Sequence, residues 1–573
     1  MPPDPAHDTP PTQPRRSTKQ RPREEICGAV LDFEAARQAR GLTQREAAQA
    51  LGVPLETLLG WRDRVARSGL PPAQRAFFES PEGVRFLAVL LVATLFVMNV
   101  CGGLGVAMVR VFFTLTGLHT LIACSETSLR RMRARMLAAI GAWGDAQDAV
   151  LAQAMAPRDI LACLDENFHA AMMLVAMEPV SGFLLVETVA DRRDGETWAA
   201  TLRAALAKWP VRLVALVGDE AKGLIRCARV WLGVAKGSDL FHVQHEICRG
   251  TAGALTQRVG RAQADLDAAR ADLATADAAR TCPAAPPGMQ ETVRRAANVV
   301  VAFNAVAAAE RAVAATEAQR AASHAAVRAL GDRYHPIDLD TGAVLTPSRV
   351  AVRLHEAFAT IRTKVHEAGL ASSRRVNDAL AKAERVLPSL VAMVETWHRL
   401  ADARITALGL TVAETAWVWA TLLPVLYLDR IAPRGADKAI RARLRGLRDQ
   451  RLAALHAPDS PWTTWSPATR VHVRAAVESC VDLFVRTSSC VEGRNGQLAL
   501  HHHRTHHLSP ALLKALTVIH NYGLTRADGT TAAERYTGQK HGDLFQHLVA
   551  TLPPPTRPRV RKAKERLPLL ATG

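Results

Sequence analysis

The sequence predicts a mixed α/β fold: a five-stranded mixed sheet with helices, interrupted by a large all-helical insertion and preceded by two smaller helical domains. Two observations predict it. Short apolar runs bounded by Gly, Pro and Ser, which are typical of strands, are concentrated in residues 160–245. Residues 251–475, by contrast, have helical periodicity and no strand alternation. A chain of 573 residues is long enough to bury more than one core.

The composition narrows the choice of partner and compartment. Lys and Arg exceed Asp and Glu by 72 − 54 = 18, and such an excess indicates a polyanionic partner, with nucleic acid as the first candidate. The alternative is compositional, because Arg-rich and Ala-rich chains also arise from GC-rich genomes. The nine cysteines include no Cys-x-x-Cys pair, and the chain begins without an apolar run. We therefore expect no disulfide framework, no zinc site of paired cysteines, and a cytoplasmic location.

The N-terminal helical pattern has a recognisable turn. Thr43 can cap a helix in which Glu46 occupies the capping-box position. Gly52 can supply a tight turn before a second helix over residues 54–67. This pattern resembles a helix-turn-helix, whose second helix would enter the major groove of DNA, although a generic helical hairpin has similar spacing. The side chains expected to contact DNA here are Thr43, Gln44, Arg45, Thr57, Trp61 and Arg62.

Residues 86–109 carry no charged side chain over about 24 positions, which is long enough to span a bilayer. Asn99 and a Gly-rich break at residues 101–105 interrupt the run, and Arg85 and Arg110 flank its two ends equally. We therefore expect a buried helix pair with a bend and no membrane partner.

The strand region reads as three consecutive strands, a helix, a strand, a helix and a fifth strand. The expected strands are residues 160–167, 171–177, 182–187, 211–218 and 239–245, with helices over 194–208 and 220–232.

Two of these strands end in acids. Asp165 is expected at the end of the first strand and Asp219 at the end of the fourth. A carboxylate at the end of a buried strand is costly unless its charge is compensated, and a divalent metal is the usual compensator. Glu166 and Glu220 are adjacent, but side chains alternate along a strand, so we expect them to support the site from outside it. His242, at the end of the fifth strand, is a further candidate to approach the metals.

The helical insertion begins with a heptad pattern. A Pro-rich break at residues 281–288 separates it from a second Ala- and Val-rich helix over 291–329, which predicts an antiparallel coiled-coil hairpin. The expected seam consists of Val259, Ala262, Leu266, Ala269, Leu273 and Ala276.

Together these features resemble a DDE transposase of a bacterial insertion sequence. Asp165, Asp219 and the strand order are similar to its RNase H-like domain. The segment Glu492-Gly-Arg-Asn is similar to the Glu-Gly-x-Asn found around the third carboxylate in some of these families. Residues 526–535 resemble their C-terminal signature, and a helical insertion before the third carboxylate is a known variant. The resemblance covers residues 160–250 and 478–548. The Tyr-x-x-Arg-x-x-x-Glu element of another group is absent, because Ser488 stands four residues before Glu492, so the subfamily is open.

The resemblance implies a domain order. It comprises residues 1–24, a disordered basic arm; 25–75, the helix-turn-helix; 76–155, a helical domain; 156–250, the first part of an RNase H-like domain; 251–475, the helical insertion; 476–548, the second part of the RNase H-like domain; and 549–573, a basic tail.

The resemblance also implies a chemistry. Asp165, Asp219 and Glu492 would be the catalytic residues and would hold two Mg²⁺ ions, which Mn²⁺ can replace, for phosphodiester hydrolysis and strand transfer. The partner would be double-stranded DNA, as element ends and target, bound by a homodimer in the bacterial cytoplasm at the nucleoid. Further contacts to DNA are expected from Lys222, Arg494, Asn495, Arg504 and Arg526.

Three further readings stay open. The chain can be a catalytically inactive, transposase-derived regulator in which the helix-turn-helix is the function. It can be a membrane-anchored protein that depends on residues 86–109. The histidines of residues 501–507 are a weaker candidate for a zinc site, because no paired Cys accompanies them.

Overall fold

A computed structural model describes residues 23–66, 72–168, 171–281, 288–435, 437–505 and 508–558. The basic arm and most of the basic tail that the sequence predicts lie outside these residues. The chain divides into two compact units. The first comprises Met1–Asp145, Lys514–Val518 and Gly542–Gly573, and the second comprises Ala146–Leu513 and Ile519–His541. The predicted mixture of helices with a five-stranded mixed sheet is confirmed.

The first unit begins with four helices: α1 (Arg23–Arg40), α2 (Gln44–Ala50), α3 (Leu55–Ala66) and α4 (Pro72–Glu79). Both helices of the predicted helix-turn-helix are present. The hydroxyl of Thr43 accepts a hydrogen bond from the Glu46 N–H at 3.3 Å, and the Glu46 carboxylate accepts one from the Thr43 N–H at 2.8 Å, so the capping box is complete. Gly52 adopts a φ of 60° in the turn, a conformation that glycine adopts without strain.

Trp61 does not have the role that the sequence suggested. Its side chain is only 6% exposed and belongs to the core of these helices, together with Phe33 and Leu58. The reason is periodicity, because Leu58, Trp61 and Val65 repeat at the three- and four-residue spacing of a buried helix face. Trp61 therefore stabilises the helix-turn-helix and is not available to contact DNA.

The apolar segment contains the predicted bend. Helix α5 (Pro81–Thr94) continues as a π-helical turn, Leu95–Cys101, and α6 (Val106–Leu115) follows after a break in which Gly103 has a φ of 68°. Asn99 is buried at the bend, where its amide donates to the Leu104 carbonyl and its Oδ1 accepts from Arg133 Nε at 2.7 Å. The other helices with residues in this unit are α7 (Glu126–Ala154), part of α21 (Pro510–Tyr522) and α23 (Leu544–Thr551).

Two helical stretches of the described chain are long and apolar enough to cross a membrane, Pro81–Cys101 and Met289–Arg333. The criterion concerns length and composition alone, and the core helix of a soluble protein also meets it. In the first stretch, 44% of the most apolar part is buried within the fold, so this stretch is enclosed only in part and the buried helix pair stays a prediction.

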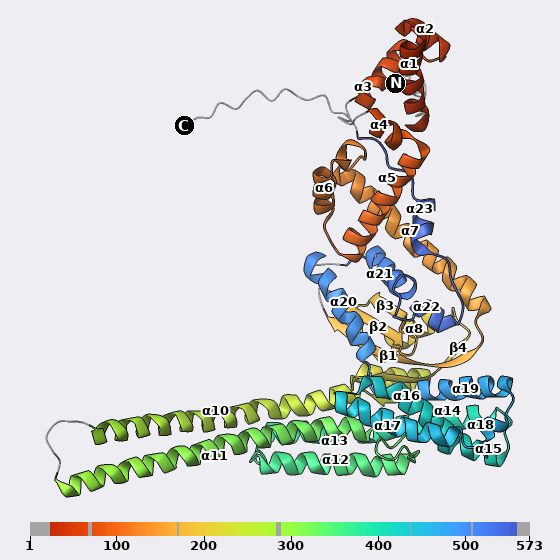
Figure 1. Cartoon of the computed structure of the whole chain (residues 1–573). Helices are drawn as coiled ribbons and strands as arrows, with labels where there is room; N and C mark the ends of the chain where they lie inside the picture. The colour runs from red at the N-terminus through yellow and green to blue at the C-terminus, as the bar shows by residue number, and fades with distance from the viewer. Residues whose placement is uncertain are drawn as a thin grey trace, which may run out of the picture. The chain divides into compact units, whose positions relative to one another are not determined.

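The sheet of the second unit has the strand order β3-β2-β1-β4-β5 (Figure 1). β2 is antiparallel to both β1 and β3, whereas β4 is parallel to β1 and β5 is parallel to β4. The first four strands match the predicted positions closely. The strands are β1 (Arg158–Phe168), β2 (Met172–Glu178), β3 (Phe183–Val189), β4 (Val211–Gly218) and β5 (Ala235–Ser238).

The fifth strand was predicted at the wrong place. β5 precedes residues 239–245, which instead open the long helix α10 (Leu240–Thr281). β5 has only four residues, Ala-Lys-Gly-Ser, and is too short and too polar to show strand alternation. Leu240, Val243 and Ile247 are buried at helical spacing, a periodicity that short apolar runs conceal. His242 consequently lies in the first turn of a helix and not at the end of a strand.

Alternation along β1 gives the sheet two different faces. Ala162 and Leu164 pack with Trp198 on α8 (Gly195–Leu206) and with Leu224 on α9 (Lys222–Arg226), which a π-helical turn, Cys227–Leu232, follows. Cys163, between them, belongs to the larger core that the opposite face shares with the helices between residues 240 and 482. One face is therefore closed by local helices, and the other packs against these later helices.

The predicted helical hairpin is present. α10 pairs along its length with α11 (Met289–Arg333), as Figure 1 shows. Ala262 and Leu266 are buried in the seam, and Val259 and Leu273 are partly buried while their helix neighbours are mostly exposed. This agrees with the heptad pattern.

The remaining helices surround this hairpin's base and the sheet. Trp397 is fully buried, and its Nε1 donates to the Cys480 carbonyl at 2.8 Å, so it belongs to the core that these helices share with the sheet. The helices are α12 (Pro347–Glu367), α13 (Arg374–Glu384), α14 (Leu387–Thr406), α15 (Val412–Trp417), α16 (Leu423–Ile431), α17 (Lys438–Leu455), α18 (Pro461–Thr464), α19 (Pro467–Asp482), α20 (Ser489–Thr505) and α22 (Ala532–Thr537).

The edge strand β3 is covered by side chains near the end of α21. Asn521 accepts from the Leu184 N–H at 2.9 Å and donates to the Leu184 carbonyl at 3.1 Å, as a neighbouring strand would. His520 Nε2 lies 2.9 Å from the Gly182 carbonyl. These contacts satisfy backbone groups that an open edge would leave unpaired.

Acidification should weaken the second unit as the pH falls from about 6.5 towards 4. The pKa of His520 is lowered from 6.5 to about 4, mainly by burial and also by the nearby charge of Arg494. In this interval the unfolded chain binds the proton and the folded chain does not, so the stability present above pH 6.5 is lost on acidification. His520→Gln keeps an N–H for the Gly182 carbonyl but does not titrate. The free energy of unfolding of this variant, measured with urea, should therefore depend less on pH between about pH 4 and 7 than that of the wild type. An equally steep curve in the variant would contradict this assignment.

Candidate metal centre

Asp165 lies within β1 and not at its end, because the strand continues through Phe168 as a hairpin with β2. Its Oδ1 accepts from the Glu166 N–H at 2.8 Å, and its Oδ2 accepts from Asn495 Nδ2 at 2.9 Å. The pKa of Asp165 is raised to about 6, mainly by burial and also by the carboxylates of Asp219 and Glu492, against the opposing effects of the Glu166 N–H and of His242. The second of these hydrogen bonds ties α20 to β1 across 330 residues of sequence.

Asp219 follows β4 directly, and its Oδ1 accepts from the Ala221 N–H at 3.0 Å. Its neighbour Glu220 is turned to Ser238 and to the buried Lys236, whose Nζ is 3.4 Å from Glu220 Oε1. Glu166 likewise leaves the site, since it accepts from Arg193 and from Trp198 Nε1 at 3.2 Å on the α8 face. Both glutamates therefore bind other groups of the fold: Glu166 is on the opposite face of β1 from Asp165, as strand alternation requires, and Glu220 lies in the loop after β4.

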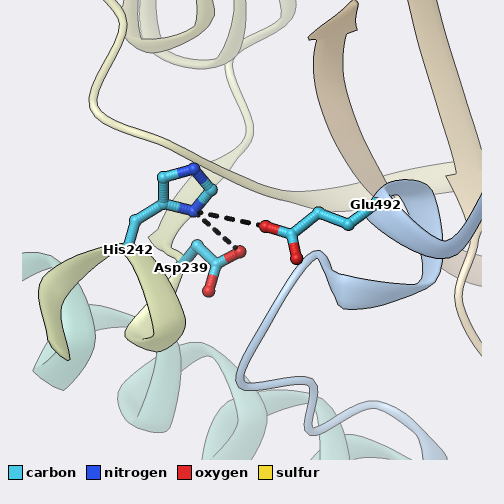
Figure 2. A group of neighbouring side chains, drawn as sticks. All are labelled: Asp239, His242 and Glu492. Carbon is cyan, nitrogen blue, oxygen red and sulfur yellow. Dashed lines mark ion pairs between the residues drawn. The ribbon is translucent and has the colours of Figure 1, made fainter. Parts of the chain in front are cut away.

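Glu492 lies in the first turn of α20 and meets two residues that flank the start of α10. His242 Nδ1 is 3.2 Å from Asp239 Oδ2 and 3.9 Å from Glu492 Oε1 (Figure 2). One ligand atom from each of these three residues lies within 4.8 Å of the others, the one such group that the described residues contain. Asp165 and Asp219 do not belong to this group, although both act on its charges.

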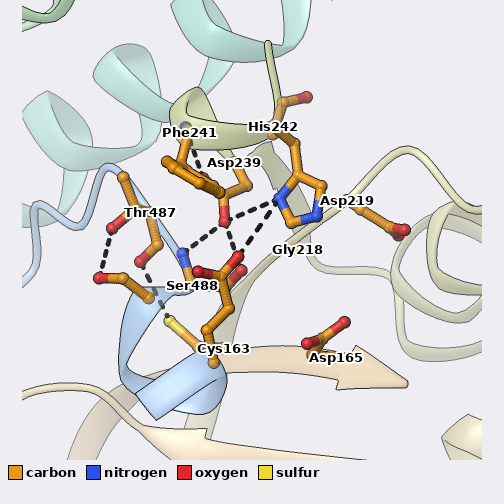
Figure 3. Close-up of polar contacts among 12 residues, drawn as sticks. Cys163, Asp165, Gly218, Asp219, Asp239, Phe241, His242, Thr487 and Ser488 are labelled. Atoms are coloured by element: carbon orange, nitrogen blue, oxygen red, sulfur yellow. Dashed lines mark hydrogen bonds and ion pairs between the residues drawn. The ribbon is translucent and has the colours of Figure 1, made fainter. Parts of the chain in front are cut away.

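Asp239 is the most buried member of the group, with 1% exposure. Its carboxylate accepts from the Phe241 N–H at 2.7 Å and from the Ser488 N–H at 2.9 Å, and the Ser488 hydroxyl also donates to it (Figure 3). Burial alone would raise the pKa of Asp239, but the contacts with His242 and Ser488 outweigh it and lower the pKa. The carboxylate therefore stays ionised and fixes the segment that precedes Glu492.

His242 and Glu492 have the opposite shifts. The contact with Asp239 raises the pKa of His242 despite partial burial. Burial raises the pKa of Glu492, and the charge of Asp239 adds to it. The shift of His242 comes mainly from Asp239 and that of Glu492 mainly from burial, and in both the negative charge of Asp239 contributes, a charge that a bound cation would offset.

The donor set fits a divalent metal. His242 Nδ1 is buried and lies 3.2 Å from Asp239 Oδ2, so in its deprotonated form it can act as a ligand beside that carboxylate. Carboxylate oxygens are preferred by Mg²⁺ and Mn²⁺, and an imidazole nitrogen shifts preference towards transition metals. Asp239, His242 and Glu492 would hold one ion, and Asp165 and Asp219 face the same region (Figure 3).

Sequence reasoning missed Asp239 and undervalued His242. Asp239 follows directly on β5, so the signal was present, but the misplaced fifth strand put this acid at a strand's beginning. Ser488 lies just before α20 begins, and its backbone N–H donates to Asp239.

The predicted DNA contacts have different fates. Lys222, Arg504 and Arg526 are exposed, and Arg526 also donates to the carbonyls of the β2–β3 turn. Arg494 is not available to phosphate, because it is 5% exposed and forms a two-pronged ion pair with Glu187 at 2.7 and 2.8 Å. The remaining candidates for DNA contact lie on α2 and α3 or at their start: Thr43, Gln44, Arg45, Thr57 and Arg62. In the histidine segment, residues 506 and 507 lie outside the residues that the structure describes.

Comparisons with known proteins add little chemistry. Residues 418–564 match a family model described as a family of unknown function, DUF6399. The match includes Glu492 and α20 but none of the strands, and it names no activity. None of the curated proteins matches the chain.

Proposed function

We propose that this chain is a DDE-type DNA transposase that binds element ends and carries out metal-dependent phosphodiester hydrolysis and strand transfer. The observation that carries the proposal is the hydrogen bond from Asn495, on the helix that carries Glu492, to Asp165 of β1, and the effects of Asp219 and Glu492 on the pKa of Asp165 support it. The strand order β3-β2-β1-β4-β5, with three antiparallel strands and then two parallel ones, supports an RNase H-like identity for this sheet.

The residues of the site have separable roles. Two Mg²⁺ ions, when bound, activate the attacking oxygen and stabilise the leaving 3′-oxygen. Asp165, Asp219 and Glu492 are the proposed ligands, and Asp239 and His242 join them because they are grouped with Glu492. Asn495 orients Asp165 through its hydrogen bond, and Ser488 orients Asp239. These second contacts keep the ligands in place before a metal or DNA arrives.

The other parts fit the same function. The helix-turn-helix would read the ends of the element, and the net charge of +18 favours double-stranded DNA as a partner. Two DNA ends must be brought together for transposition, so we propose a homodimer on DNA in the bacterial cytoplasm.

Purified protein should nick a supercoiled plasmid that carries the DNA flanking its gene, in the presence of Mg²⁺ or Mn²⁺ and not of EDTA. Nicking should be absent from a plasmid without that DNA at equal protein concentration, which separates specific cleavage from contamination. Binding to the flanking DNA without metal-dependent nicking would instead favour the inactive regulator, because the helix-turn-helix alone suffices for that result.

A further inference from the structure

A large cavity opens beside the candidate metal centre, within the second unit. Its volume is about 1110 Å³, above the range of about 300–1,000 Å³ that is usual for small-molecule sites. Its walls come from the start of α10, the end of α11, the end of α16 and the segment between α19 and α20. It is therefore formed where the helical insertion meets the sheet edge.

The cavity lies next to the metal centre. Leu240 and Phe241 line it, and they lie between Asp239 and His242 in the chain. Ser489 and Cys490 also line it, and they belong to the first turn of α20, which carries Glu492. Residues of the metal centre and residues of the cavity lining therefore alternate along the same two segments.

The charged lining is predominantly basic. Four arginines line the cavity, against two acids, Asp332 and Asp437. The arginines are Arg328, Arg430, Arg434 and Arg486.

The four arginines differ in whether other groups of the fold already bind them. Arg430 pairs with Asp482 at 2.9 Å, and Arg486 donates to the Gly331 carbonyl at 2.9 Å, so both are engaged by the fold. Arg328 and Arg434 are exposed and make no side-chain hydrogen bond or ion pair with any residue that the structure describes. Their guanidinium groups come from different elements and are available to an anion.

We propose that this cavity holds the sugar–phosphate chain of a single nucleic-acid strand next to the phosphate at the metal centre, with Arg328 and Arg434 contacting its phosphates. The proposal rests on the proposed function, which assigns the adjacent acids to a phosphodiester. It adds a binding path for the strand and names the insertion as the element that provides it. A free nucleotide has the same phosphate chemistry, but it would occupy less of the cavity and would not need a metal centre next to the cavity.

Binding of a fluorescein-labelled single-stranded oligonucleotide to the full-length protein, measured by anisotropy in EDTA across a salt series, tests this proposal. Because each phosphate contact contributes about 0.7 to the slope of log K against log salt, Arg328→Gln with Arg434→Gln should reduce that slope by about 1.4. A single-stranded probe is chosen because the helix-turn-helix reads duplex DNA. ATP, tested as a competitor, represents the free-nucleotide source.

Arg374→Gln is the matched control, because Arg374 is 96% exposed on α13 and lies outside the cavity lining. It should leave the slope unchanged if the cavity, and not total charge, is responsible. An equal slope in the double variant and the wild type would overturn the proposal. So would a double variant that loses ATP binding while its oligonucleotide slope is unchanged. The binding assay is run in EDTA and does not depend on catalysis. If the double variant lowers the slope although the wild type never nicks DNA, the cavity is still assigned as a strand-binding site, and only the proposed nicking and strand-transfer activity is rejected.

Discussion

Changing Asp165 to asparagine should reduce metal-dependent nicking by about 10³-fold or more while DNA binding stays unchanged. A metal-binding carboxylate contributes several kcal/mol of transition-state charge stabilisation, and about 4 kcal/mol corresponds to that factor. Asparagine has nearly the same shape and keeps one oxygen, so the change removes charge with little disturbance of packing. Asp219→Asn and Glu492→Gln should have effects of similar size, measured as initial nicking rates at saturating Mg²⁺.

The neighbouring acid provides the control. Glu166→Gln removes one charge at the next position of β1, and the new amide oxygen can still accept from Trp198 Nε1. Its nicking rate should stay within a few-fold of the wild type, because Glu166 is turned to the α8 face. If Glu166→Gln were as inactive as Asp165→Asn, general loss of charge or of stability would explain both results. If Asp165→Asn nicked at the wild-type rate, the assignment of the site would be wrong.

Much of the sheet could be predicted because its strands are apolar and bounded by turn residues. β1 to β4 each bury several β-branched or aliphatic side chains, and their order follows from short connections and one crossover helix. β5 could not be predicted, since its four residues carry no such pattern and depend on a buried lysine that bonds to neighbouring carbonyls. The hairpin of α10 and α11 was predictable for the opposite reason, because its heptads are local and long.

The candidate site was predictable only in part. Asp165 and Asp219 are visible in sequence as acids that close apolar runs, and Glu492 through its motif. Asp239 and His242 join the site because α10 begins at Leu240, well before Val259, where its heptad pattern starts, so that Asp239 precedes the helix and His242 lies in its first turn. Burial also decides which charged residues are available. Nothing in the local sequence shows that Arg494 is enclosed while Arg526 is exposed, because the enclosing residue is on a strand about 300 positions away.

Replacing Arg494 by methionine should lower the free energy of unfolding by about 3–5 kcal/mol, the usual cost of removing one partner from a buried ion pair. Arg494 Nε and Nη2 contact the two oxygens of Glu187 at 2.7 and 2.8 Å, and the side chains are 5% and 0% exposed. Methionine would leave the Glu187 carboxylate buried without its guanidinium. Urea unfolding of the full chain, followed by tryptophan fluorescence, measures the loss.

The double variant Glu187→Gln with Arg494→Met should recover much of this loss, because no buried charge then remains uncompensated. Arg494→Lys should recover less, since an ammonium cannot reproduce the two parallel hydrogen bonds. Arg474→Met, at an exposed pair with Glu478, should change stability by less than about 1 kcal/mol. Full stability in Arg494→Met together with weaker DNA binding would instead restore the sequence-based role of Arg494 as a phosphate contact.

The same ion pair should also affect the site. It fixes α20 against β3 two residues after Glu492 and one before Asn495, which holds Asp165. Under conditions where Arg494→Met is still folded, its nicking rate should therefore be lower than that of the wild type, because Glu492 and Asn495 are less well placed. A higher Mg²⁺ concentration should restore part of this rate, because bound metal favours the conformation in which its ligands are together. Asp165→Asn lacks a ligand and should show no such recovery. This difference distinguishes a residue that positions the site from one that binds the metal.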